Sequence, residues 1–159
     1  MTERDKSLRI MNITAAVLFG LTALLYIYVS LFPNEIIKLF TGMSDVNVSK
    51  ETMLYMIFST IKPAAFTAIG ITGFTRKSMS FKSGLITAVG SGILWLFPPA
   101  IVKTYIVSVF ARLSGIEQFS YLNTLNSAVS IFSFMSSIGI LLIFGSAVAE
   151  TYAVKTFKS

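Results

Sequence analysis

The chain has 159 residues, of which 54% are hydrophobic and 13% are charged, and its formal net charge is +6. A soluble domain usually carries about 25% charged residues, so this composition excludes an ordinary soluble domain. The sequence contains no cysteine and no histidine, which excludes disulfides, thiol nucleophiles, cysteine-bound haem or iron–sulfur groups, and imidazole–zinc sites.

Four apolar stretches are long enough to cross a bilayer, whose hydrocarbon core of ~30 Å needs about 20 residues of helix. They run roughly over residues 10–32, 53–74, 85–110 and 125–149. Little polar sequence remains to cover four such helices in water. We therefore predict an all-α, multi-pass integral membrane protein, in which residues 1–159 form a single domain, an antiparallel bundle of four transmembrane helices.

The first stretch is followed by the longest connection of the chain. Pro33 stops the first span, and the apolar face between Pro33 and Gly42 predicts a short interfacial helix in this first outer loop. Asn47 begins an Asn-Val-Ser triplet, which is a possible glycosylation site. Such triplets are common by chance, and only a glycosylating host modifies them.

Lys62 is the one charge of the second stretch. It lies about nine residues from the outer end of the span, hence ~13 Å deep, where a charge costs ~2.5 kcal/mol or more. No carboxylate of the chain lies within the membrane to pair with it. Three partners remain open: backbone carbonyls freed by Pro63 or by the prolines of the third stretch, a carboxylate of another protein, or an anion such as a lipid phosphate.

The third stretch combines small residues, two prolines and a second lysine. Gly84, Ala88 and Gly92 recur every fourth residue and predict close helix packing. Pro98 and Pro99 predict a kink, which we expect to be fixed rather than hinged. Lys103 lies near the outer headgroups or, in a tilted helix, at nearly the depth of Lys62, where two cations would favour an anion.

Two further sets of small residues are candidates for helix packing. Ser130, Ser133 and Ser137 fall on one face of the fourth stretch, and we favour a packing seam there over a water path. Ala64 and Ala68 offer a shorter seam on the second stretch. Close approach of backbones is what holds helices together in lipid.

Lysine and arginine gather in the two tails and in the connection after the second stretch. The positive-inside rule therefore places both termini in the cytoplasm. Because these basic residues flank apolar helices, they fit anchoring to anionic lipid better than binding of nucleic acid.

The sequence shows no catalytic constellation, metal-ligand set or cofactor loop, so we expect no enzyme activity and no cofactor. We predict an accessory or structural subunit that packs against partner membrane subunits, or against copies of itself, within a larger complex. Lys62 and Lys103 are the candidate contacts to a ligand or partner. The alternative is a small anion or lipid-headgroup transporter or channel that uses these lysines and works as an oligomer.

Overall fold

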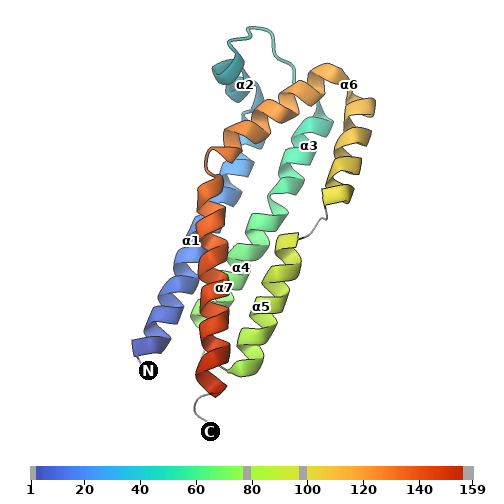
Figure 1. Ribbon diagram of the computed structural model, residues 1–159. Helices are drawn as coiled ribbons and strands as arrows, with labels where there is room; N and C mark the ends of the chain where they lie inside the picture. The colour runs from blue at the N-terminus through green and yellow to red at the C-terminus, as the bar shows by residue number, and fades with distance from the viewer. Residues whose placement is uncertain (1–2, 77–79, 97–99, 156–159) are drawn as a thin grey trace. The chain divides into compact units, whose positions relative to one another are not determined.

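The computed structural model describes residues 3–76, 80–96 and 100–155 (Figure 1). Every regular element in these ranges is an α-helix, so the prediction of an all-helical fold is confirmed for them. The helices are α1 (Glu3–Leu31), α2 (Pro33–Thr41), α3 (Lys50–Ser59), α4 (Ile61–Thr75), α5 (Phe81–Leu96), α6 (Ala100–Ser130) and α7 (Ser133–Lys155).

Three segments of the described chain are long and apolar enough to cross a membrane. They are Asp5–Leu31, Lys50–Thr75 and Ser133–Tyr152. The first two correspond closely to the first two predicted stretches, and the second of them contains both α3 and α4. These segments fit the prediction of a membrane protein.

The third predicted stretch, residues 85–110, is not described as one continuous helix. Helix α5 ends at Leu96 after 16 residues, which is about 24 Å of helix and shorter than the ~30 Å hydrocarbon core. The predicted kink residues Pro98 and Pro99 lie outside the described residues, and α6 begins at Ala100.

The fourth predicted stretch begins later than expected. Helix α6 continues to Ser130, and a turn at residues 131–132 separates it from α7. Ser130, Ser133 and Ser137 are all exposed, and the turn separates Ser130 from the two serines of α7, so the packing seam proposed for them stays a prediction. The turn interrupts the helical periodicity on which that prediction depended.

The chain divides into two compact units. Unit 1 comprises Met1–Leu21, Lys62–Phe97 and Phe134–Ser159, and unit 2 comprises Thr22–Ile61 and Pro98–Ser133. In unit 1, the N-terminal part of α1 lies beside α4 and α7 (Figure 1). Unit 2 contains α2, α3, α6 and the C-terminal part of α1, and both α2 and α3 contact α6.

Close backbone contacts bring α4 and α7 against α1 in unit 1. The rings of Phe19 and Phe66 stack with their centroids 4.5 Å apart. Gly139 of α7 faces Phe19 so closely that a Cβ added there would lie 2.7 Å from the ring. Gly73 of α4 faces Asn12 in the same way, with 2.6 Å from an added Cβ to the amide carbon Cγ of Asn12. Glycine at these positions lets three helices approach within packing distance.

The small residues of α5 contribute unequally to packing. Gly84 is buried, and a Cβ there would lie 2.9 Å from the carbonyl oxygen of Ala147 on α7. Gly92 lies beside the ring of Phe144 at an ordinary distance, 3.4 Å from an added Cβ, and Ala88 is half-buried. The closest approach of α5 to α7 is therefore at the start of α5.

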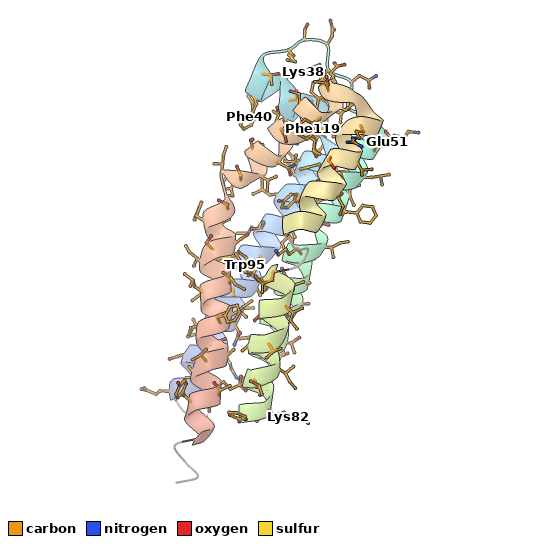
Figure 2. All side chains as sticks on the ribbon, turned by 45° about the vertical axis from the view of Figure 1, so that its right-hand side comes forward. Lys38, Phe40, Glu51, Lys82, Trp95 and Phe119 are labelled. Atoms are coloured by element: carbon orange, nitrogen blue, oxygen red, sulfur yellow. The ribbon has the colours of Figure 1, made fainter. Side chains whose placement is uncertain are left out.

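Unit 2 has its own apolar core, which contains Val29, Ile37, Met56, Tyr121 and Leu125. Helix α2 forms where an interfacial helix is predicted and ends at Gly42, whose φ of 72° suits glycine. Ile37 of α2 is buried, whereas Leu39 and Phe40 are exposed; Figure 2 labels Lys38 and Phe40 on this helix.

Two features of α6 shape unit 2. Gly115 has φ 83° and ψ 164°, which interrupts the helix and which side-chain-bearing residues essentially never adopt. Beyond this point, Gln118 accepts from the N–H of Ser49 at 2.8 Å and donates to the carbonyl of Asn47 at 2.8 Å. Tyr121 donates to the Glu117 carboxylate at 2.5 Å, and this hydrogen bond raises the pKa of Tyr121 above its ordinary value.

Candidate functional site

A buried carboxylate, Glu150, is the centre of a polar cluster in unit 1. We call Arg76, Ser80, Ser83, Thr87 and Glu150 the Glu150 cluster. Arg76 directly follows α4, the two serines flank the start of α5, and Glu150 lies on α7. Glu150 is only 5% exposed. A polar group so far from water is stable only where hydrogen-bond partners surround it.

The donors of the cluster converge on both carboxylate oxygens. Arg76 Nη1 lies 3.1 Å from Glu150 Oε2 and 3.3 Å from Oε1. The backbone N–H of Ser80 donates to Oε1 at 2.9 Å, and the Ser83 hydroxyl also donates to Oε1. Arg76 Nη2 donates to the Thr87 hydroxyl at 3.2 Å. The guanidinium thereby connects the end of α4 with α5 and α7.

The start of α5 favours an anion at this position. The hydroxyl of Ser80 accepts from the N–H of Ser83 at 3.1 Å, which is the usual contact of a helix N-cap. The helix dipole adds positive potential at its N-terminus, where carboxylates are stabilised. The carboxylate of Glu150 therefore occupies the position at which the N-terminus of α5 favours an anion.

A second buried polar contact joins α1 to α7. Asn12 donates to the carbonyl of Leu8 at 2.9 Å, and its side-chain oxygen accepts from the hydroxyl of Ser146 at 3.0 Å. One turn before Asn12, Arg9 Nη2 donates to the carbonyl of Arg76 at 2.7 Å. Through these bonds α1 is attached to the same end of unit 1 as the Glu150 cluster.

Lys62 is held within unit 1 by the end of α5. Its Nζ donates to the carbonyl of Trp95 at 2.6 Å and lies 5.1 Å from the centroid of the Trp95 ring. Helix α5 ends at Leu96, so the carbonyl of Trp95 has no partner within the helix, and a cation is favoured at this terminus. Figure 2 shows Trp95 and Lys82 toward opposite ends of α5.

A backbone carbonyl is one of the three partners that the sequence leaves open for Lys62, and the carbonyl of Trp95 is such a partner. Contact of Lys62 with a ligand or with another protein stays a prediction. Lys103 lies on α6, and its side chain is outside the described part of the structure. The structure therefore does not bring the two lysines together in a described site.

Pro63 is buried in α4 and follows a helix interruption. Helix α3 ends at Ser59, and α4 begins at Ile61. The N–H of Thr60 donates a hydrogen bond to the carbonyl of Ile57 at 3.0 Å. Proline has no N–H with which to bond the carbonyl of Ser59 four residues earlier, and this accounts for the break.

The glycosylation triplet lies in the connection before α3. The side chain of Asn47 is exposed, while Val48 is buried and Ser49 caps α3 by accepting from the N–H of Thr52. The triplet is therefore fixed to the core of unit 2, with the acceptor side chain at the surface.

Sequence reasoning missed the Glu150 cluster. It assigned Arg76 to membrane orientation and treated Glu150 as the polar end of an apolar helix. The available signal was that one arginine and one glutamate end apolar stretches on the same predicted side of the membrane. The two residues are 74 positions apart, so no local sequence pattern indicates that they pair.

No three His, Cys, Asp or Glu side chains gather as a potential metal site in the part of the chain that the structure describes. Comparison with known protein families, with curated proteins and with solved structures finds no match. The function is therefore argued from the geometry alone.

Proposed function

We propose that this chain is a four-crossing integral membrane protein with both termini in the cytoplasm, which serves as a non-catalytic structural or accessory subunit of a larger membrane complex. The observation that carries the proposal is the Glu150 cluster. Its carboxylate accepts from a guanidinium, a backbone N–H and a hydroxyl of its own chain. These groups stabilise helix packing, which is the role expected of a scaffold.

The outward faces of unit 1 support packing against another membrane helix. Ala64 and Ala68, the predicted seam of α4, are exposed one turn apart. Gly90 of α5 is also exposed, and an added Cβ there would meet nothing within 4 Å. Small residues on an outer face favour close approach by a helix of a partner subunit or of a second copy.

The proposal is tested by sizing the protein extracted from its native membrane in mild detergent. Wild type is expected to migrate as a stoichiometric complex, and the double variant Ala64→Leu/Ala68→Leu is expected to dissociate from it, because added bulk separates the backbones. Phe74→Trp adds bulk at an exposed position about 100° around α4 from Ala64 and Ala68, and it serves as the control. A wild-type protein that migrates as a lone monomer would refute the subunit function.

The alternative function, anion or lipid-headgroup transport, depends on Lys62. The ammonium is only half-buried, and the neighbouring Trp95 is 40% exposed, so this position remains open to a ligand. Anion flux into liposomes separates the two functions. Wild-type flux above background that Lys62→Met removes would favour transport, whereas identical background flux from both proteins would eliminate it.

A further inference from the structure

Arg9 carries a hydrogen-bond donor that unit 1 leaves without an acceptor. Its Nη2 donates to the carbonyl of Arg76, but its Nε is buried and has no hydrogen-bond partner within the described residues. Unpaired buried donors are rare in native proteins and often mark a missing water, ion or ligand. Because this donor belongs to a cation, an anion would be the most stabilising acceptor.

The surroundings of Arg9 suit an anion. Lys6, three residues earlier on α1, and Lys82, in the first turn of α5, are both exposed, while Asp5, one turn before Arg9, does not accept a hydrogen bond from Nε. The carboxylate of Glu150 is already engaged by Arg76 and by the start of α5. At the end of unit 1 that holds Arg9, the carboxylates of Asp5 and Glu150 therefore leave the Nε donor without an acceptor.

The position of Arg9 along α1 indicates the source of the anion. The charge-free stretch of α1 begins at Ile10, so Arg9 lies at the boundary of the first predicted span. The headgroup layer adds ~5–7 Å on each side of the hydrocarbon core. An arginine side chain at this depth reaches the phosphate layer of the adjoining leaflet.

We propose that Arg9 binds the phosphate group of an anionic lipid at the cytoplasmic boundary, with Nε as one of the donors. The proposal rests on the proposed membrane insertion of α1. Guanidinium recognises phosphate through several N–H groups in a fixed plane, which an ammonium does not reproduce. Anionic lipids are the phosphate source that the cytoplasmic leaflet supplies.

The test compares binding of phosphatidylglycerol and of phosphatidylcholine with the same acyl chains, using the full chain in a zwitterionic detergent and native mass spectrometry. Arg9→Gln and Arg9→Lys are expected to weaken phosphatidylglycerol binding by about tenfold, since a charge-assisted hydrogen bond is lost. Lys6→Gln removes one exposed charge at the same end and is expected to weaken binding by less than about fivefold.

The Arg9→Lys variant distinguishes a site that needs the guanidinium group from general attraction between a positive charge and an anionic lipid. If Arg9→Lys binds phosphatidylglycerol as wild type does, the charge alone matters and the site is refuted. If millimolar inorganic phosphate displaces the lipid completely, the ligand is a soluble phosphate and the lipid proposal is wrong.

Folding and membrane insertion are checked separately. Without added lipid, Arg9→Lys is expected to unfold cooperatively as wild type does, which shows that the variant is folded. Phosphatidylglycerol is then expected to raise the melting temperature of wild type and of Lys6→Gln but not of Arg9→Lys. Resistance to extraction by alkaline carbonate tests membrane insertion alone. A protein that resists extraction but fails the Arg9→Lys comparison refutes this site and leaves the proposed membrane protein intact.

Discussion

Removing one partner of the Arg76–Glu150 ion pair is expected to destabilise the protein, and the two possible removals should differ in size. The Arg76 side chain is 22% exposed and the Glu150 side chain 6% exposed. Breaking a buried pair costs about 3–5 kcal/mol, because it leaves an uncompensated buried charge. Arg76→Gln strands the less exposed charge, so it should cost about 3 kcal/mol.

Glu150→Gln leaves the charge of Arg76 without its partner, and Arg76 is the more exposed of the two side chains. Arg76 can rehydrate in part, and the glutamine keeps one carbonyl oxygen for the N–H of Ser80. We therefore expect a smaller loss of about 2 kcal/mol in the free energy of unfolding. The double variant should be less destabilised than the sum, with a coupling energy of about 1.5–3 kcal/mol.

The assay is a double-mutant cycle on the free energy of unfolding, measured by circular dichroism during titration of mixed micelles with a denaturing detergent. Lys82→Gln is the matched control, because Lys82 is exposed at the same end of α5 and should change stability by less than about 0.5 kcal/mol. A coupling energy below about 0.5 kcal/mol would refute the reasoning, because exposed pairs give values of that size. A larger cost for Glu150→Gln than for Arg76→Gln would also contradict it.

Three other outcomes follow from the packing and backbone geometry. Gly73→Ala should lower the melting temperature, at a cost of about 1–3 kcal/mol, because its Cβ would lie 2.6 Å from Asn12. Gly90→Ala, with open space around it, should be neutral or stabilising in the same thermal scan. Gly115→Ala should cost about 1–3 kcal/mol in the micelle titration, because only glycine adopts this backbone conformation readily; an unchanged midpoint would contradict the described break in α6. In glycosylating microsomes, Asn47 should acquire a glycan that Asn47→Gln lacks, and an unmodified wild type would contradict the proposed orientation.

Composition and periodicity were sufficient to predict most of the helices, but they did not predict where each helix begins and ends. Long apolar runs require helices in lipid, so α1 and the segment of α3 and α4 could be predicted closely from sequence. The start of α7 could not, because the turn before Ser133 occurs in an uncharged run of apolar residues and serines without proline or glycine at the break. The break in α6 at Gly115 could not be predicted either, because the positive φ of this glycine depends on tertiary packing.

For Lys62 the sequence left a backbone carbonyl as one of three possible partners, and for Glu150 it predicted no contact. A single lysine in an apolar stretch needs a polar partner, and the last carbonyls of a helix lack a partner within that helix. Glu150 instead resembles an ordinary helix-end residue until its burial is known. The donors that surround it come from the end of α4 and the start of α5, and sequence separation conceals this arrangement.

The pairing of Arg76 with Glu150 has a consequence for how the protein is made. Seventy-four positions separate the two residues, and at ~5–20 residues per second the ribosome needs about 4–15 s to cover that distance. During this interval the guanidinium and the beginning of α5 have been synthesised, while their acidic partner has not. A nascent chain arrested before residue 150 therefore lacks the carboxylate that joins the end of α4 and the start of α5 to α7.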